Sequence, residues 1–115
     1  MDIERHGTTR RYSDIVIHND TIYLVEVPLS ADSDITTQTR EVLNCIEASL
    51  AKAGSDTTRL LHVTLYLPDM ADYAAVNAVW DAWVPEGTAP SRACIQGGLA
   101  NPGWRIEAVV TAARL

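Results

Sequence analysis

Residues 89–96, APSRACIQ, form the segment around which the rest of the chain is predicted to fold. The segment begins just after a proline and is typical of a short strand. Successive side chains of a strand point to opposite faces, so Arg92, Cys94 and Gln96 are expected to share one face. Arginine is rarely buried without a partner, and the rest of the sequence must therefore supply one for Arg92.

A second strand is predicted for residues 60–67, which are apolar at nearly every position, as in strands covered on both faces. A helix is predicted between the two strands. Asp69 is its expected N-cap, Asp72 adds a favourable negative charge to its first turn, and Pro85 ends it. We interpret its aromatic stripe as core that packs on the sheet, the alternative being a ligand platform. The stripe consists of Tyr73, Val76, Trp80 and Trp83.

The N-terminal half predicts a hairpin followed by a helix. Residues 12–18 and 21–27 are rich in β-formers and flank the turn signal Asn19-Asp20. A helix with Asp34 as N-cap and Gly54 after its end follows. Its apolar stripe is Val42, Leu43, Ile46 and Leu50.

The last predicted strand covers residues 105–113, which gives the order β-β-α-β-α-β-β in a single domain, residues 1–115. This order predicts an α+β fold in which two helices pack on one face of a β-sheet and a hairpin lies at each end of the chain. The other face of so apolar a sheet needs a cover, which indicates oligomerisation.

Composition and charge exclude several classes of function. The net charge of −6 argues against a nucleic-acid-binding surface, so no nucleic-acid partner is expected. No apolar run approaches the length of a membrane span and residues 1–6 have no apolar signal-peptide core, so we expect a cytoplasmic protein without a membrane partner. Cys45 and Cys94 are expected to be reduced thiols. The three histidines lack the spacing of metal ligands, so no metal is expected.

Arg92 and Glu107 are the candidate chemical pair, because they lie on the last two predicted strands, which we expect to be neighbours. A structural salt bridge is the simpler interpretation of this pair, and a functional pair is the alternative. A Cys–His–Asp triad is a further alternative that nothing in the sequence positions.

The sequence resembles the reactive intermediate deaminase (RidA, or YjgF) family, once named endoribonuclease L-PSP, and its YoaB-like branch. The resemblance runs from about residue 12 to the C-terminus. It rests on the combination of a helix motif, residues 69–77, with the strand motif of residues 89–94. Further matches are residues 38–43 and 105–108.

The resemblance implies a chorismate-mutase-like fold, a homotrimer with clefts between subunits, and hydrolysis of 2-imino acids to 2-keto acids and ammonia without a cofactor. Arg92 would bind the substrate carboxylate and Glu107 would position or activate water. Backbone groups at Cys94 would contact the imine nitrogen, and Tyr12 and Asn77 would line or support the cleft. The ligand partner would be a small 2-imino or 2-keto acid.

One segment departs from the family pattern. Leu24-Val25-Glu26-Val27-Pro28 replaces a Ser-Gly-Gln segment common in the family, which adds a carboxylate near a site for carboxylates. The alternative function is therefore a non-catalytic trimeric protein that binds a small carboxylate or regulates another process. A ribonuclease is a third possibility, which the acidic charge disfavours.

Overall fold

The structure, a computed structural model, describes residues 2–115. Short strands alternate with two α-helices, and a single 3₁₀ turn precedes β4 and another precedes α2. The strands are β1 (Glu4–His6), β2 (Ile15–His18), β3 (Thr21–Glu26), β4 (Leu60–Leu67), β5 (Ser91–Gln96) and β6 (Glu107–Ala113). The helices are α1 (Ile35–Lys52) and α2 (Tyr73–Trp83), and the 3₁₀ turns are Thr57–Arg59 and Met70–Asp72.

The predicted hairpin and first helix are confirmed. β2 and β3 pair antiparallel around Asn19 and Asp20, whose φ angles of 53° and 63° are those of a tight hairpin turn. Asp34 caps α1 through a 2.7 Å bond that its carboxylate accepts from the Thr37 N–H. Gly54 lies beyond the end of α1 with a φ of 81°, where glycine avoids strain.

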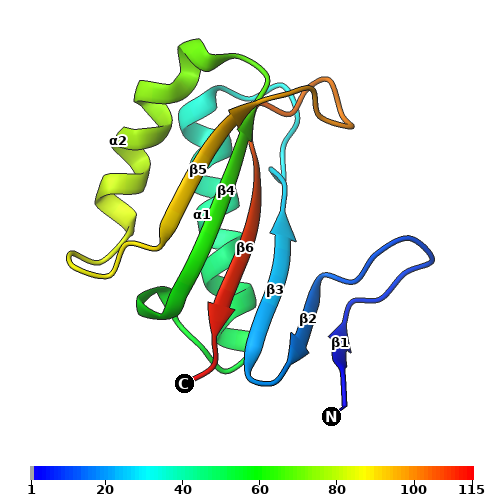
Figure 1. Cartoon of the computed structure of the whole chain (residues 1–115). Helices are drawn as coiled ribbons and strands as arrows, with labels where there is room; N and C mark the ends of the chain where they lie inside the picture. The colour runs from blue at the N-terminus through cyan, green and yellow to red at the C-terminus, as the bar shows by residue number, and fades with distance from the viewer. Residues whose placement is uncertain (1) are drawn as a thin grey trace.

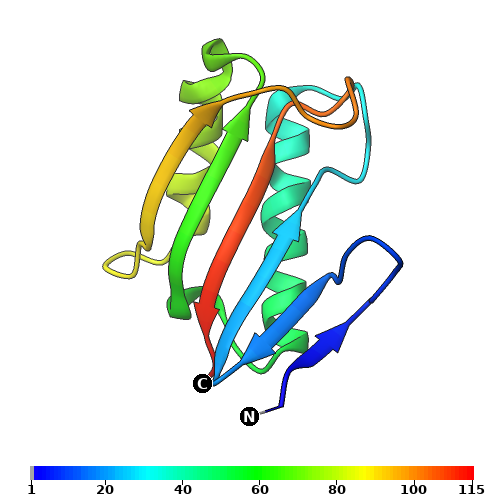
Figure 2. The same ribbon diagram turned by 45° about the vertical axis from the view of Figure 1, so that its right-hand side comes forward.

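The six strands form one sheet in the order β1-β2-β3-β6-β4-β5, with both helices on one face (Figures 1 and 2). β4 and β5 run parallel and are connected through α2, as a parallel pair requires. β6 lies antiparallel between β3 and β4. The prediction of a second hairpin formed by the last two strands is therefore wrong, because β4 separates β5 from β6.

The helix-covered face of the sheet holds the core. The buried members of the two predicted helical stripes pack there against alternate residues of the strands. These include Val42, Leu43, Ile46, Leu50, Val76 and Trp80 of the helices, and Ile22, Leu24, Val63, Leu65, Ala108 and Val110 of the strands. The alternation in each strand sends the neighbouring residues to the opposite, open face. Two of them, Val25 and Val109, face each other and are 49% and 37% exposed.

The connection from β5 to β6, residues 97–106, crosses the end of β4 and is held by two buried side chains (Figure 2). The Gln38 amide donates to the Gly103 carbonyl (2.9 Å) and accepts from the Arg105 N–H (2.7 Å). Arg105 also forms a two-point ion pair with Asp72, at 2.7 and 3.1 Å.

These bonds explain two differences from the sequence prediction. β6 begins at Glu107 and not at residue 105, because the Arg105 N–H is bonded to Gln38 and not to a neighbouring strand. Asp72 was expected to add a negative charge to the first turn of the helix, and its pairing with Arg105 and its burial, at 7% exposed, were not predicted. Its charge stabilises the connection to β6 as well as the start of α2.

Candidate active site

Arg92 projects from β5 toward α2. The residues paired with β5 in register, Val63 and Leu65, are buried in the core, which places Arg92 and Cys94 on the helix-covered face as expected. The Arg92 guanidinium donates to the Asn77 side-chain oxygen at 2.8 Å and to the Tyr73 hydroxyl at 3.3 Å. Asn77, which the resemblance places at a position that lines or supports the cleft, is thus in direct contact with Arg92.

Two aromatic rings of α2 complete the support of Arg92. Its guanidinium carbon lies 5.1 Å from the centre of the Trp80 ring and 5.8 Å from the Tyr73 ring. Such contacts favour a cation through the negative face of the ring. Trp80 is buried core, as predicted from the helical stripe, but its contact with Arg92 was not predicted from the sequence. The spacing of Tyr73, Asn77 and Trp80 at steps of four and three residues was the available signal.

Within residues 2–115, no carboxylate lies within ion-pair distance of Arg92. Its partners are a neutral amide, a hydroxyl and two rings, and they leave most of its five N–H donors for another group. A partly buried guanidinium held by neutral neighbours favours a bound anion, above all a carboxylate or phosphate that accepts two bonds.

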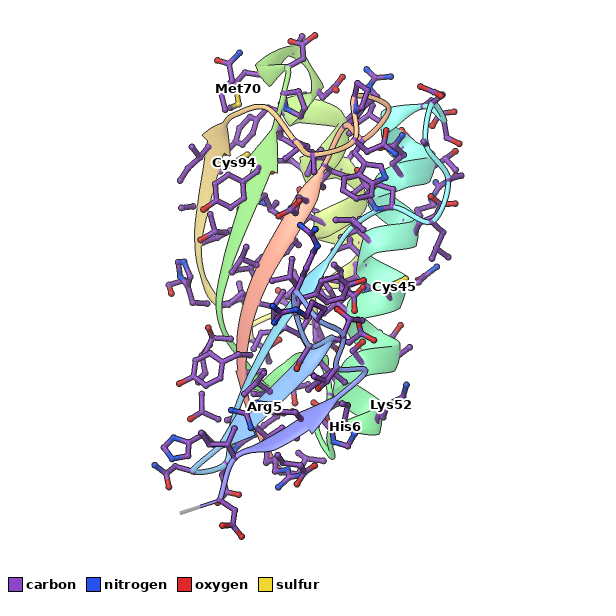
Figure 3. All side chains as sticks on the ribbon, turned by 90° about the vertical axis from the view of Figure 1, so that its right-hand side faces the viewer. Arg5, His6, Cys45, Lys52, Met70 and Cys94 are labelled. Atoms are coloured by element: carbon purple, nitrogen blue, oxygen red, sulfur yellow. The ribbon has the colours of Figure 1, made fainter. Side chains whose placement is uncertain are left out.

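Cys94, labelled in Figure 3, lies two residues after Arg92 on β5 and therefore on the same face of the strand. Burial raises the pKa of its thiol, and the nearby Arg92 charge only partly opposes this effect. A thiol with a raised pKa is a poor nucleophile at neutral pH. This agrees with the expectation that the Cys94 thiol need not react.

Glu107 lies on the opposite side of the sheet from Arg92. It pairs in register with Tyr66, whereas the next residue of β6, Ala108, is buried under the helices. Glu107 therefore belongs to the open face, and β4 lies between its strand and that of Arg92. The expected Arg92–Glu107 pair does not form within one chain, so the structural salt bridge predicted from spacing is wrong.

Tyr12 lies with Glu26 and Trp104 in a different region, at a pocket of about 360 Å³ near the end of β3. One chain thus presents two separate half-sites. The anchor half consists of Arg92, Asn77, Tyr73 and Trp80. The pocket half consists of Tyr12, Val25, Glu26, Val27 and Trp104. Glu107 does not line this pocket and lies on the neighbouring strand, β6.

The remaining candidates have structural roles. His62 on β4 bonds through one ring nitrogen to the Ser91 hydroxyl at 2.8 Å and through the other to the Thr64 hydroxyl at 2.9 Å. In the described part of the chain, no group of three or more His, Cys, Asp or Glu side chains comes together that could hold a metal ion. Cys45 on α1 and Cys94 on β5 are both unpaired thiols that lie well apart (Figure 3).

Comparison with known proteins decides the family. The family model described as Endoribonuclease L-PSP matches residues 3–114. The chain belongs to this family, which is the RidA/YjgF family that the sequence motifs resemble. The RutC family protein YoaB of Escherichia coli K12 is 44% identical over 113 residues, covering 98% of this chain and 99% of YoaB.

Other RidA/YjgF proteins agree in fold. A crystal structure of a YjgF-family protein from Neisseria meningitidis has a TM-score of 0.96 at 46% identity, and the match covers all of this chain and 97% of that one. The protein named 3-aminoacrylate deaminase RutC of Acinetobacter baylyi is 36% identical over 87 residues, 70% of this chain and 68% of that protein. The predicted chorismate-mutase-like arrangement, two helices on one face of the sheet, is confirmed.

Neither helix in residues 2–115 combines the length and the apolar character that are needed to cross a bilayer.

Proposed function

We propose that the protein hydrolyses reactive 2-imino acids, or their enamine tautomers, to 2-keto acids and ammonia. The observation that carries this proposal is Arg92, a partly buried cation that no carboxylate of the described chain neutralises and that four side-chain contacts hold in place. Membership of the RidA/YjgF family and the deaminase name of the Acinetobacter relative support the reaction class.

The reaction requires little chemical assistance because an imine carbon is already electrophilic. Arg92 binds the substrate carboxylate through two hydrogen bonds and so fixes the C=N group relative to the site. Glu107 positions a water molecule and accepts its proton as the oxygen bonds to the imine carbon. Glu107 passes this proton to the nitrogen, which gives the neutral carbinolamine and restores the carboxylate. The hydroxyl proton then moves to the same nitrogen as the C–N bond breaks, so that ammonia leaves and the keto group forms.

The two half-sites must come from two copies of the chain. Arg92 and Glu107 lie on opposite faces of one sheet, so a single chain cannot place both on one substrate. The open face that carries Glu107 is also the apolar face, with Tyr23, Val25, Ile95 and Val109 exposed. Burial of this face in a homotrimer, which is typical of the family, forms three clefts, each with Arg92 from one copy and Glu107 from another.

Imine hydrolysis by variants tests the proposal. An amino-acid oxidase generates the imine in place, and loss of imine is compared with that in buffer. Arg92→Ala is expected to lower kcat/KM by about 100-fold, since two hydrogen bonds to a charge are lost. Glu107→Gln is expected to lower kcat by about 100-fold or more, as for other general bases.

Matched controls change the same residue types at exposed positions outside the site. Arg40→Ala and Glu47→Gln on α1 should retain wild-type rates. No acceleration by the wild-type protein would contradict the enzymatic proposal. Carboxylate binding that is retained in that case and lost in Arg92→Ala would instead indicate the non-catalytic binding protein.

A further inference from the structure

The pocket half-site indicates which imino acids the proposed enzyme prefers. The pocket of about 360 Å³ is open on one side and falls within the size range of small-molecule sites, roughly 300–1,000 Å³. It is larger than a methyl or ethyl side chain needs. Its lining residues are Tyr12, Ser13, Asp14, Val25, Glu26, Val27 and Trp104.

The pocket exists because β2 is shorter than β3. The pairing of these strands ends at Ile15 and Leu24, so beyond Leu24 only β6 borders β3. The segment Tyr12–Asp14 turns away from the sheet there and leaves a gap beside the end of β3. Glu26 pairs with Ala108, and continuing this register brings Val27 beside Glu107. Glu107 does not line the pocket, but this register places it one strand away from the pocket wall that Val27 forms.

The walls of the pocket are mainly apolar and one of them is fixed. Four of the seven lining residues, Tyr12, Val25, Val27 and Trp104, are aliphatic or aromatic. The backbone groups of Gly103 and Arg105, on either side of Trp104, are both bonded to the fully buried side-chain amide of Gln38. The backbone N–H of Trp104 donates to the Asn101 carbonyl at 3.0 Å. A wall held in this way is formed before a ligand arrives, which favours shape selectivity.

Glu26 lines the pocket from the helix-covered side of the sheet, because it pairs in register with the buried Ala108. Its carboxylate accepts a 2.8 Å bond from Ser49 on α1, with Asp14 and Lys52 as the charged groups near it. Burial, and to a lesser degree the negative charge of Asp14, raises the pKa of Glu26. Two acidic groups disfavour a carboxylate at this end of the cleft. The carboxylate of the substrate is thus directed to Arg92 and its side chain to the pocket.

We propose that this pocket receives a bulky apolar side chain, and that the preferred substrates are 2-imino acids with branched aliphatic or aromatic side chains. This inference rests on the proposed deaminase function and refines its substrate class. Filling an apolar pocket with one more methylene changes kcat/KM by roughly 10- to 200-fold in enzymes. We therefore expect the imines of leucine and phenylalanine to be at least about tenfold better substrates than that of alanine.

The test measures kcat/KM for imines generated by an amino-acid oxidase from alanine, leucine and phenylalanine. Val27→Phe places a ring in the pocket, and the phenylalanine-to-alanine ratio should fall by about tenfold or more. Leu29→Phe adds the same ring at a position that is 78% exposed and outside the pocket, and its ratio should equal that of the wild type. An alanine imine that is the best substrate of the wild type, or a ratio that Val27→Phe leaves unchanged, would overturn the inference.

A second measurement requires only the wild-type protein. Calorimetry should show that phenylpyruvate, the aromatic keto-acid product, binds at least about tenfold more tightly than pyruvate. Equal affinities would overturn the pocket assignment even if Val27→Phe failed to fold. Hydrolysis of small imines alone would contradict this inference and leave the proposed function intact, whereas no hydrolysis of any imine would contradict the proposed function itself.

Discussion

At the scale of single residues, the surroundings of Arg92 determine what the protein can bind. Neutral groups hold the guanidinium: a 2.8 Å bond to Asn77, a longer bond to Tyr73 and the face of Trp80. None of them cancels its charge. A carboxylate in place of one of these neighbours would have occupied the arginine permanently, and the proposed site would have been blocked.

Asn77 variants test this point. Asn77→Ala removes one hydrogen bond to a charged group, worth about 1.5–3 kcal/mol, and should raise KM about tenfold with a smaller effect on kcat. Asn77→Asp places a carboxylate beside Arg92 and should raise KM further, because the substrate must displace it. An Asn77→Asp protein with wild-type KM would contradict the anchoring role of Arg92.

A Trp83 variant tests how much a buried N–H donor without a hydrogen-bond partner lowers the stability of the protein. Its indole N–H is the one buried side-chain polar atom in the described part of the chain that has no hydrogen-bond partner. Trp83→Phe removes this donor and should leave the free energy of unfolding unchanged or raise it by up to about 1 kcal/mol, measured by urea denaturation. Trp80→Phe is the comparison and should destabilise the protein. A loss of more than about 2 kcal/mol in Trp83→Phe would contradict this account.

The raised pKa of Glu26 predicts that the free energy of unfolding depends on pH. Its pKa in the folded protein is raised above the usual value of about 4.3, mainly by burial. The folded state therefore binds the carboxyl proton of Glu26 more tightly than the unfolded state does. The stability that this protonation contributes is fully present below the usual pKa and is lost as the pH rises through the raised pKa. Glu26→Gln should be more stable than the wild type at pH 7, by less than about 1 kcal/mol because the group is half exposed. The difference should vanish near pH 4, and a difference that grows toward low pH would contradict the prediction.

At the scale of elements, the connection between β5 and β6 determines the geometry of the pocket half-site. Gln38 on α1 bonds to backbone groups on both sides of Trp104, and the Asp72–Arg105 pair ties the same connection to the start of α2. α2 also carries Asn77, so this ion pair links the two half-sites of one chain.

Gln38→Leu tests the connection. The substitution keeps a side chain of similar size but removes three hydrogen bonds, to the Ser33 and Gly103 carbonyls and from the Arg105 N–H. The Gly103 carbonyl keeps its bond from the Asp32 N–H, and the free energy of unfolding should fall by about 2–4 kcal/mol. Gln96→Leu changes an exposed glutamine at the end of β5 and should change stability by less than about 0.5 kcal/mol. Urea denaturation measures both. Equal effects of the two substitutions would contradict the role assigned to Gln38.

Local signals in the sequence were sufficient for most elements. The Asn19-Asp20 turn, the Asp34 cap and the stripe from Val42 to Leu50 are decided by neighbouring residues, and the structure confirms them. The signal for Gln38 was present but unused, since it lies four residues before Val42 on the buried stripe. A polar residue in that position requires buried partners.

The order of the strands could not be predicted in the same way. β6 lies between β3 and β4, and this position depends on pairing between residues that are far apart in the sequence. No turn signal after Gln96 indicates which strands β6 will pair with. The separation of Arg92 from Glu107 follows from that order. The family resemblance correctly predicted the fold. The roles that it implies for Arg92 and Glu107 stay predictions, and it did not reveal that the two residues lie on separate sides of one chain.

At the scale of the whole molecule, one face of the sheet is covered by helices and the other is exposed and partly apolar. The proposed trimer buries this second face. Val109→Lys introduces a charge at its centre and should convert the trimer to monomers while the circular dichroism spectrum is retained. Ala78→Lys on the outer surface of α2 is the control and should remain trimeric by light scattering. A wild-type protein that is monomeric would contradict the proposed assembly.

Mixing two inactive variants tests most directly whether each cleft takes Arg92 from one copy of the chain and Glu107 from another. In the shared-cleft arrangement, Arg92→Ala and Glu107→Gln trimers each lack one group in every site, but a mixed trimer contains a cleft with both groups intact. Subunit exchange in a 1:1 mixture should restore imine hydrolysis to about one quarter of the wild-type rate, the fraction of clefts with both native residues. If both residues acted from the same chain, no mixed trimer would contain an intact site. A mixture that exchanges subunits and stays inactive would contradict the account.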